Sequence, residues 1–460
     1  MEAYDLIVIG SGPAGEKAAI QAAKFRTKVI VIESRGVVGG GCVHTGTLPS
    51  KTLRETVLYL AGLRQRSVYG IVCALKSNVT VAELMYRTKN VIQNELDIIQ
   101  NKLMRNGIVV VSGRGSLLSP QEVLIEDESG PGRQLRADAV IIATGSRPHR
   151  DPDLQFDDVL VFDGETILNL DRIPKSLLVV GGGVIGCEYA CIFAHLGVKV
   201  TLIEGRERLL PHLDREISDT LTYLMRKNRI KVILGDRIDR MAKEDGGVTL
   251  TTQSARTISG DKALFTTGRV GNTSSLGLEQ LGIKTDDWGL IQVDENFHTG
   301  VGRVYAVGDV IGFPSLASVS MDQGRMAARH AFGPTQSKLN SLLPFGIYTI
   351  PEISMVGETE ESLGAKGIPY ETGVARFFEL ARGQISADHD GMLKLIFCPR
   401  TRKLLGVHII GEGAADLIHI GQAVISFEAT IDYFIETVFN FPTMSEAYKI
   451  AALNGLSNLK

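Results

Sequence analysis

The segment Gly10-Ser11-Gly12-Pro13-Ala14-Gly15 lies between an apolar run, Tyr4 to Ile9, and an alanine-rich stretch that extends to about Phe25. A second apolar run then ends at Glu33, 18 residues after the last glycine. This G-x-G-x-x-G spacing between strand and helix predicts a tight turn that lets backbone amides approach a pyrophosphate, with Glu33 accepting hydrogen bonds from a ribose. The segment therefore predicts a dinucleotide-binding unit that begins the chain.

The same pattern occurs a second time, about 170 residues later. An apolar run, Leu177 to Val180, leads into Gly181-Gly182-Gly183-Val184-Ile185-Gly186 and a helical stretch to about Leu196. The next apolar run ends at Glu204, again 18 residues after the last glycine. Chance glycines would not reproduce strand, helix and acid together, so the repeat predicts an α/β chain with two Rossmann-like domains that bind two different dinucleotides.

Length, composition and charge restrict the function classes. The 460 residues exceed one ordinary domain, and 44% hydrophobic with 22% charged residues is typical of a soluble globular chain. Lys+Arg 49 against Asp+Glu 52 leaves a net charge of −3, which gives no basic excess for a nucleic-acid partner. No apolar run approaches the roughly 18 residues of a membrane span. The first ten residues carry no basic leader, so we expect a cytoplasmic protein without a membrane partner.

The five cysteines are scattered and odd in number, which argues against a secreted disulfide framework. Cys187 and Cys191 stand one helical turn apart. A metal pair is conceivable there, but no further Cys or His stands at ligand spacing, so we expect two small core residues and no metal site.

Residues Gly39 to Lys51 (GGGCVHTGTLPSK) follow the first fingerprint and carry one cysteine. Together with both fingerprints, this stretch resembles the flavoprotein disulfide reductases. In that family the loop has the form Gly-Gly-x-Cys-x-x-x-x-Cys-x-Pro-Ser-Lys, and its two cysteines form a redox disulfide beside the flavin. This chain keeps Cys42 but has Thr47 at the second position, whose hydroxyl cannot replace the thiolate that faces the flavin.

The resemblance covers essentially the whole chain and implies a division into four segments. They are residues 1–147 for the FAD-binding domain, 148–268 for the NAD(P)-binding domain, 269–333 for the return to the FAD-binding domain, and 334–460 for an α+β interface domain. Residues 334–342 are polar, which predicts a linker. The interface domain implies a homodimer or a larger homo-oligomer.

The resemblance also implies the residues that hold the cofactors. Ala143-Thr144-Gly145 lies near the adenosine of FAD, Asp309 binds a ribityl hydroxyl, and the helix that starts near Ala317 points at the flavin pyrimidine. A positive helix end there would stabilise an anionic reduced flavin. Asp309 could instead be only a helix N-cap. The predicted FAD and NAD(P)(H) residues are Gly10, Gly12, Gly15, Glu33, Ser34, Gly40, Gly41, Cys42, Lys51, Ala143, Thr144, Gly145, Asp309, Ala317, Gly181, Gly183, Gly186, Glu204, Arg206 and Gly268.

Two residues are predicted to be catalytic, Lys51 and Glu188. In the family, the lysine of Pro-Ser-Lys lies near flavin N5 and pairs with a glutamate in the second fingerprint helix, where this chain has Glu188. A buried pair of this kind would favour negative charge on the reduced ring. The alternative is two unrelated surface charges.

The far end of the chain lacks the second group that dithiol chemistry needs. Disulfide reductases end in His-Pro-Thr-x-x-Glu, whose histidine serves as the acid/base from the partner subunit. Phe441 stands at that position, and a phenyl ring cannot move a proton. Thr443 and Glu446 have capping-box spacing, which predicts a structural role for Glu446. Cys42, left alone, is predicted to be a packing residue.

What remains is FAD, a nicotinamide pocket and no protein electron acceptor. The sequence therefore predicts a Si-specific NAD(P)⁺ transhydrogenase, in which a reduced nucleotide delivers hydride to FAD and an oxidised nucleotide removes it from the same pocket. Glu204 favours a free ribose 2′-hydroxyl, whereas Arg206 and Arg208 either hold the 2′-phosphate of NADP(H) or are solvated surface charges. The alternatives are an NAD(P)H:quinone reductase or diaphorase, and a non-catalytic flavin-bearing partner or redox sensor. Thr47 and Phe441 argue against dihydrolipoamide dehydrogenase activity, because they replace the second cysteine and the acid/base histidine.

Overall fold

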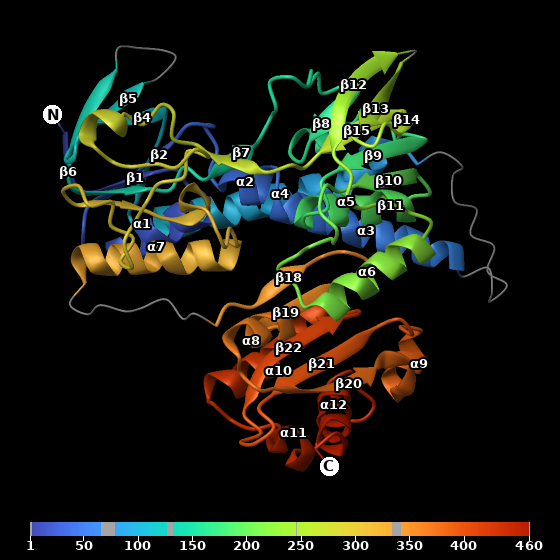
Figure 1. Cartoon of the computed structure of the whole chain (residues 1–460). Helices are drawn as coiled ribbons and strands as arrows, with labels where there is room; N and C mark the ends of the chain where they lie inside the picture. The colour runs from blue at the N-terminus through green and yellow to red at the C-terminus, as the bar shows by residue number, and fades with distance from the viewer. Residues whose placement is uncertain (1, 66–78, 127–131, 245, 334–341, 460) are drawn as a thin grey trace.

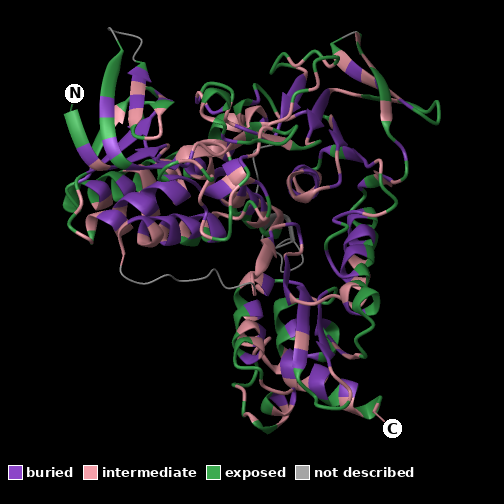
Figure 2. Cartoon of the chain, turned by 60° about the vertical axis from the view of Figure 1, so that its left-hand side comes forward, coloured by how far each residue is buried: buried purple, intermediate pink, exposed green. Residues whose placement is uncertain are grey.

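The computed structural model describes residues 2–65, 79–126, 132–244, 246–333 and 342–459. Figure 1 shows three units, each built around its own sheet, with the C-terminal unit below the other two. We call them the first nucleotide unit, the second nucleotide unit and the C-terminal unit. Figure 2 shows buried residues concentrated on the strands and on the inner helix faces of each unit.

The first nucleotide unit is a mixed sheet of seven strands in the order β3-β2-β1-β6-β5-β4, with β17 paired to β6. The apolar runs predicted from the sequence form its centre, because β1 pairs in parallel with both β2 and β6, and Ile7 lies opposite Ile30 and Val140. Helices α1 and α7 lie side by side along one face (Figure 1). The strands are β1 Glu2–Ile9, β2 Val29–Glu33, β3 Val109–Ser112, β4 Arg114–Ser119, β5 Glu122–Glu126, β6 Arg133–Ile142 and β17 Val304–Ala306; the helices are α1 Pro13–Ala23, α2 Gly40–His44, α3 Thr47–Gln65, α4 Val81–Arg105 and α7 Ala317–Phe332.

The second nucleotide unit repeats this design with a parallel sheet in the order β11-β10-β9-β15-β8. A separate antiparallel sheet, β12-β13-β14, lies beside it. Strands β7 Ser146–Pro148 and β16 Arg269–Gly271 pair where the chain passes between the two nucleotide units. The remaining elements are β8 Val161–Asp163, β9 Ser176–Val180, β10 Lys199–Ile203, β11 Lys231–Ile233, β12 Ile238–Glu244, β13 Gly247–Thr252, β14 Thr257–Gly260, β15 Lys262–Phe265, α5 Val184–His195 and α6 Arg215–Lys227.

The C-terminal unit is an antiparallel sheet in the order β18-β19-β22-β21-β20, packed against helices. One apolar cluster joins this unit to the others, since Ile350 and Met355 share a core with Leu53 and Val57 of α3 and with Cys191 of α5. The elements are β18 Phe345–Ile347, β19 Ile353–Gly357, β20 Glu371–Arg376, β21 Met392–Phe397, β22 Leu404–Ile410, α8 Glu360–Lys366, α9 Ala381–Ser386, α10 Ala414–Ser426, α11 Asp432–Glu436 and α12 Glu446–Ser457. The predicted fold class, two dinucleotide-binding units and a C-terminal α+β unit, is confirmed.

Two expectations differ from the structure. Residues Gly39 to Lys51 are not a loop: they form α2 and the first turns of α3, where Pro49 is tolerated because the first helical N–H groups need no intrahelical acceptor. The capping box at Thr443 is wrong, because α12 begins at Glu446 with Ser445 as N-cap, and the Thr443 hydroxyl donates to Asn440 O. Residues 334–341 of the predicted linker lie outside the described residues. The segment boundaries at 147, 268 and 333 stay a prediction.

Candidate functional site

The glycines of the first fingerprint stand where no side chain fits. Gly10 has φ +102°, and a Cβ there would lie 2.4 Å from Ala143 O. A Cβ on Gly15 would lie 1.9 Å from Gly10 O, so strand β1 turns directly into helix α1. Gly12 is the N-cap of α1 and makes no side-chain cap bond, which leaves the first amides of the helix available to an anion.

The acid at the end of β2 is bound to this turn. The Glu33 carboxylate is 5% exposed and accepts hydrogen bonds from Ser11 N at 3.0 Å, Ser11 Oγ at 2.5 Å and Arg35 N at 2.9 Å. Ser34 is exposed in the turn that follows. The structure therefore brings Glu33 beside the glycine turn, as the ribose role requires.

Helix α2 begins against the same turn. A Cβ on Gly40 would lie 2.7 Å from Gly12 Cα, and Gly39 N donates to Ser11 O at 3.2 Å. Gly41 and Cys42 follow in the first turn of α2. Two helix N-termini, those of α1 and α2, therefore meet at one backbone contact, and both present amides to it.

Two more predicted FAD segments meet at the carboxyl end of β6. Ala143 N donates to Ile9 O at 2.8 Å, and the turn continues through Gly145 at φ +69°. Asp309, in the short 3₁₀ helix Gly308–Ile311, accepts from Ser146 Oγ at 3.3 Å. Asp309 is not the N-cap of α7; that position is Leu316, which precedes Ala317 and provides no side-chain bond.

These residues fit an FAD molecule. Thr144 Oγ1 is buried in this turn and has no hydrogen-bond partner among the described residues, although buried hydroxyls are normally paired. The uncapped ends of α1 and α7 supply amides for phosphate and for an anionic ring. The donors and acceptors of a bound dinucleotide would satisfy both features.

The second fingerprint reproduces the first in geometric detail. A Cβ on Gly181 would lie 2.7 Å from Thr266 Oγ1, and one on Gly186 would lie 1.9 Å from Gly181 O. Gly183 is the uncapped N-cap of α5. Glu204 accepts from Gly182 N at 2.6 Å and from Arg206 N at 2.8 Å, the counterparts of the Ser11 and Arg35 amides around Glu33.

The two arginines after Glu204 have different partners. Arg206 clasps the Glu204 carboxylate with Nε and Nη2, both at 2.9 Å. Burial raises the pKa of Glu204, but the hydrogen bonds from Arg206 and Gly182 outweigh it and hold the pKa below its ordinary value. Arg208 instead donates to Glu361 Oε1 at 2.9 Å and to Pro211 O at 2.7 Å. Of the two arginines, only Arg206 therefore binds Glu204, the acid that is predicted to bind a ribose.

Lys51 and Glu188 form an ion pair, although they lie on different helices and 137 residues apart. Lys51 Nζ lies 2.7 Å from Glu188 Oε2, and the Glu188 side chain is only 4% exposed. The other carboxylate oxygen, Oε1, accepts from Tyr348 N at 2.9 Å, and the Lys51 ammonium lies 5.1 Å from the centre of the Tyr348 ring. The alternative of two unrelated surface charges is excluded.

Cys42 is hydrogen-bonded to the Thr47 side chain, and no other described cysteine forms a disulfide with it. Burial raises the pKa of Cys42 despite a hydrogen bond with the Thr47 side chain, so the sulfur stays protonated at neutral pH. Cys42, Cys187, Cys191 and Cys398 are all free thiols, and Cys187 and Cys191 are buried in α5 as expected of core residues. The place of a redox disulfide is thus held by a thiol and a hydroxyl.

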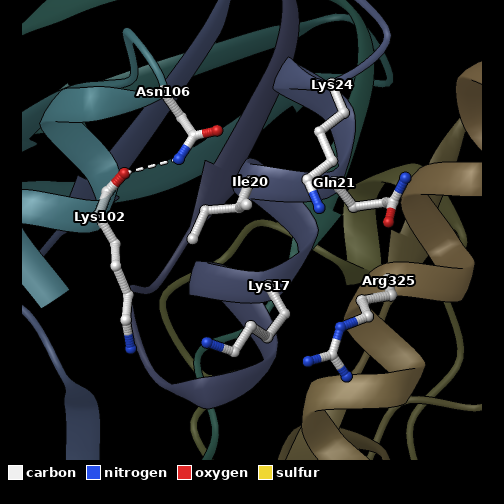
Figure 3. A pocket seen from close by; sticks show the side chains of 7 residues that line it. All are labelled: Lys17, Ile20, Gln21, Lys24, Lys102, Asn106 and Arg325. Carbon is white, nitrogen blue, oxygen red and sulfur yellow. Dashed lines mark hydrogen bonds between the residues drawn. The ribbon is translucent and has the colours of Figure 1, made fainter.

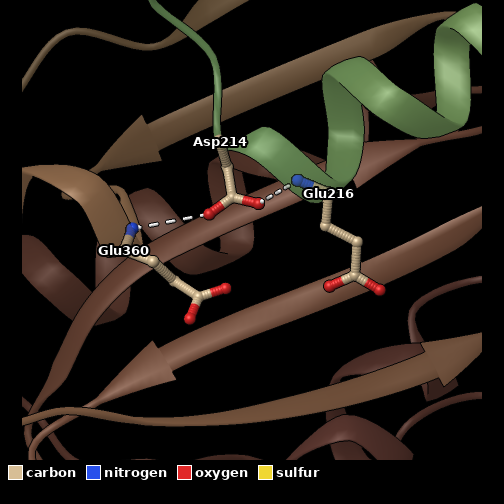
Figure 4. A group of neighbouring side chains, drawn as sticks. All are labelled: Asp214, Glu216 and Glu360. Atoms are coloured by element: carbon tan, nitrogen blue, oxygen red, sulfur yellow. Dashed lines mark hydrogen bonds between the residues drawn. The ribbon is translucent and has the colours of Figure 1, made fainter.

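Two other groups of charged side chains lie outside the fingerprint turns. Asp214, Glu216 and Glu360 bring carboxylate oxygens within 4.8 Å of one another (Figure 4). The buried ammonium of Lys394 already occupies this position, at 2.9 Å from Asp214 and 3.2 Å from Glu216 and in contact with Glu360, so the cluster is an ion-pair network.

A cavity of about 340 Å³ lies over α1, α4 and α7 (Figure 3). Three of its four cations are paired with acids, Lys17 and Lys102 with Glu16 and Arg325 with Asp322. None of the fingerprint residues lines it. Its lining residues are Lys17, Ile20, Gln21, Lys24, Lys102, Asn106 and Arg325.

The remaining predicted residues are accounted for as follows. Gly268 has φ +136° and lies against the Trp288 ring, next to Arg269, whose guanidinium binds Ser146 and Glu165. Phe441 is 72% exposed on the C-terminal unit. Sequence reasoning missed Tyr348, because it acts through its backbone N–H and no side-chain pattern marks such a role.

The chain belongs to the pyridine nucleotide-disulphide oxidoreductase family. The family profile matches residues 4–324, and the profile of the family's dimerisation domain matches residues 343–452. The expected cofactor chemistry, FAD with NAD(P)(H), is confirmed by this membership. No helix among the described residues is both long and apolar enough to cross a membrane.

Similar proteins match over the whole length. A Mycobacterium bovis protein named soluble pyridine nucleotide transhydrogenase is 46% identical over 100% of this chain and 98% of its own. A Pseudomonas aeruginosa protein of the same name is 43% identical over 99% of both chains. Among solved structures, LpdA from Mycobacterium tuberculosis superposes with a TM-score of 0.90 at 29% identity, covering 98% of this chain and 99% of its own. The Escherichia coli flavoprotein disulfide reductase RclA superposes at 0.89 and 25%, with the same coverage.

Proposed function

We propose that this protein is an FAD-dependent soluble transhydrogenase that moves hydride between NADPH and NAD⁺, or between NADH and NADP⁺. One observation carries the proposal: Cys42 faces the Thr47 hydroxyl, and no cysteine in the described part of the chain forms a disulfide with it, so these residues place no dithiol at the position of the family's redox disulfide. The names of the full-length relatives support it.

Different residues of the chain would bind the dinucleotides and provide charge near the flavin. Bound FAD would accept hydride from one nicotinamide nucleotide and return it to another. The two fingerprint turns, with the residues around Thr144 and Asp309, would hold and orient the two dinucleotides. The Lys51–Glu188 pair would place a positive charge beside the redox centre without leaving a buried carboxylate unpaired. All the site residues predicted from the sequence keep these roles as part of the proposal.

Use of both coenzymes follows from the Glu204–Arg206 pair. Glu204 accepts two backbone amides and is positioned to bind a ribose 2′-hydroxyl, as NAD(H) requires. When NADP(H) binds, the Arg206 guanidinium would exchange the carboxylate for the 2′-phosphate, since both are bidentate acceptors. We therefore propose dual use with better affinity for NAD(H).

The proposal includes a cytoplasmic homodimer. The C-terminal unit exposes large apolar side chains that a monomer would leave in water, among them Val438 at 90%, Phe427 at 85% and Phe441 at 72%. The dimerisation-domain profile covers all three. Sedimentation of the holoenzyme tests this: a dimer is expected, and a monomer at micromolar concentration would contradict it.

The function is tested by mixing the yellow protein anaerobically with NADPH and thio-NAD⁺, and in parallel with NADPH and a quinone. Fast reduction of thio-NAD⁺ is the expected result. Fast quinone loss without nucleotide exchange would replace the proposal by a quinone reductase. A reductive titration that consumes two further electrons on a protein group would also overturn it.

A further inference from the structure

We propose that Arg54 is a positioning residue for the Lys51–Glu188 pair, and that it acts by anchoring residues Tyr348 to Glu352 of the C-terminal unit against α3. Arg54 lies one turn after Lys51 on α3 and is 3% exposed. A guanidinium buried to this degree needs partners for its donors. The partners, and what they hold in place, define its role.

The partners of Arg54 are on the C-terminal unit. Arg54 Nε donates to Thr349 O at 3.0 Å, in a contact between residues 295 apart in sequence. Arg54 Nη1 lies 3.3 Å from Glu352 Oε1 and 2.7 Å from Glu55 Oε1. Glu55 is 54% exposed, so its pairing contributes little, whereas Glu352 is 13% exposed. The Thr349 and Glu352 contacts therefore carry the anchor.

The anchored segment reaches the catalytic pair through one residue. Tyr348 precedes Thr349, and its N–H donates to Glu188 Oε1, while Lys51 binds Oε2 of the same carboxylate. Glu188 thus divides its two oxygens between a lysine of the first nucleotide unit and an amide of the C-terminal unit. The position of the carboxylate depends on both donors, since a buried carboxylate that loses one donor turns toward the other.

The anchor is rigid at both ends. Arg54 lies on the face of α3 next to Leu53 and Val57, which share one core cluster with Ile350. Gly411 N donates to Glu352 O at 2.8 Å, and Ala415 N donates to Glu352 Oε2 at 3.4 Å, which ties the acid to β22 and α10. Loss of Arg54 would remove the polar link between α3 and residues Thr349 to Glu352. The Tyr348 N–H, next to Thr349, would then no longer be held in position.

The structure also provides a matched control. Lys394 is another buried cation, 1% exposed, that joins the C-terminal unit to a nucleotide unit, through Asp214 and Glu360 at the start of α6 and α8. Within the part of the chain that the structure describes, its ion pairs are with Asp214, Glu216 and Glu360, and none is with Lys51, Glu188 or Tyr348. Arg54→Met and Lys394→Met therefore both remove a buried inter-unit cation, but only the first acts on the catalytic pair.

The test compares these two variants with Arg54→Lys, which keeps the charge beside Glu352 and loses the planar fork that binds Thr349 O. The first readout is hydrogen exchange of the Tyr348 amide, measured with and without FAD. We expect at least about tenfold faster exchange in Arg54→Met, a smaller rise in Arg54→Lys, and no change in Lys394→Met. If Arg54→Met does not fold, Arg54→Lys decides the result alone.

The second readout is the midpoint potential of the flavin in the holoenzyme. The inference rests on the proposed function in placing Lys51 beside the flavin, so a displaced pair should shift the potential to more negative values in Arg54→Met and not in Lys394→Met. Equal losses of thermal stability with unchanged exchange and potential would overturn the inference. Failure of the proposed function is distinguishable, because a quinone reductase would still show the Arg54-dependent shift while failing to exchange nucleotides.

Discussion

In the proposed function, two neighbouring side chains, Glu204 and Arg206, would discriminate between NAD(H) and NADP(H). Glu204→Gln removes the negative charge that would repel a 2′-phosphate and releases Arg206 from its bidentate pair. We expect the Kd for NADPH to fall about tenfold, or about 1.4 kcal/mol, while the Kd for NADH rises. Titration of flavin or nucleotide fluorescence measures both constants.

The neighbouring arginine provides the control for this experiment. Arg208→Ala removes a cation that binds Glu361 and Pro211, so the ratio of the two dissociation constants should stay as in the wild type. Arg206→Ala should weaken NADPH binding selectively. If Arg208→Ala changes the ratio and Arg206→Ala does not, the 2′-phosphate binds elsewhere.

The role of Cys42 is testable by its reactivity. Burial raises the pKa of Cys42, whereas hydrogen bonds from Thr401 lower the pKa of Cys398. The thiolate is the reactive form, so iodoacetamide at pH 8 should label Cys398 faster than Cys42, and labelling of Cys42 should still accelerate with pH after labelling of Cys398 has levelled off. Peptide mapping by mass spectrometry at several pH values reads out both sites.

A second measurement separates packing from catalysis at the same residue. Cys42→Ser replaces the thiol by a hydroxyl of similar size that can keep the contact with Thr47. We expect transhydrogenase activity within about twofold of wild type, since a packing residue contributes no chemistry. Rapid labelling of Cys42 at pH 7, or loss of activity in the serine variant, would show that the thiol takes part in the reaction.

At the scale of elements, α1 and α7 approach each other through glycine. A Cβ on Gly324 of α7 would lie 2.1 Å from Ala14 O at the start of α1, the helix that carries the first fingerprint. In an open helix position glycine to alanine stabilises by about 0.5–1 kcal/mol, but overpacking of a tight contact destabilises by about 1–3 kcal/mol. The steric effect exceeds the propensity effect, so Gly324→Ala should destabilise the protein and weaken FAD binding.

The same substitution at Gly62 is the control. Gly62 lies in α3 with no atom within 4 Å of its added Cβ, so Gly62→Ala should leave the thermal midpoint unchanged or raise it. Thermal unfolding and the ratio of flavin to protein absorbance report stability and FAD content. An unchanged midpoint in Gly324→Ala would show that α7 can move away from α1 without loss.

How far the sequence predicts these elements depends on the source of each signal. Strands β1 and β9 contain the apolar runs Tyr4 to Ile9 and Leu177 to Val180 and end at the same residues, because a short apolar run that stops at glycine is typical of a buried strand. Helix α6 was not predicted, although it is strongly amphipathic, since its surroundings carry no family motif. Helix α2 differs from the expected loop. Its three successive glycines favour a turn in the sequence, and the sequence does not show the backbone at Gly12, before α1, against which this segment packs as a helix.

The catalytic pair was predictable only through resemblance. Nothing local connects Lys51 to Glu188, and nothing in the sequence marks Arg54 or the Tyr348 amide, because their roles arise from contacts between units far apart in the chain. The spacing predicted Glu204 at the ribose and left Arg206 as either a ligand of the 2′-phosphate or a surface charge, and no sequence pattern marks the bidentate bond between the two side chains. Contacts between particular polar groups are thus the part of the site that the sequence does not predict.

At the scale of the whole molecule, the C-terminal unit is held to the second nucleotide unit by Lys394. Its ammonium forms ion pairs with three carboxylates at the junction of α6 and α8, and removing one partner of a buried charge network destabilises by about 3–5 kcal/mol. Lys394→Met should therefore lower the thermal midpoint by several degrees at pH 7.5. Lys227→Met, which removes an exposed lysine paired with Asp390 across the same junction, should change it little.

The pH dependence of this variant has a definite sign. In the wild type, burial raises the pKa of Asp214, but His408 and Lys394 lower it by more, so its pKa in the folded protein lies below its pKa in the unfolded chain. The ionised carboxylate therefore stabilises the protein at pH values above the unfolded-state pKa, and this contribution is lost as the pH falls. Without the ammonium, the Glu216 and Glu360 carboxylates repel that of the buried Asp214, whose pKa should rise above its value in the unfolded chain, so stability is lost as the pH rises through it. The difference in thermal midpoint between Lys394→Met and wild type should consequently shrink from pH 7.5 to pH 5. A difference that stays constant over this interval would mean that Lys394 stabilises the junction by packing of its aliphatic stem and not by its charge.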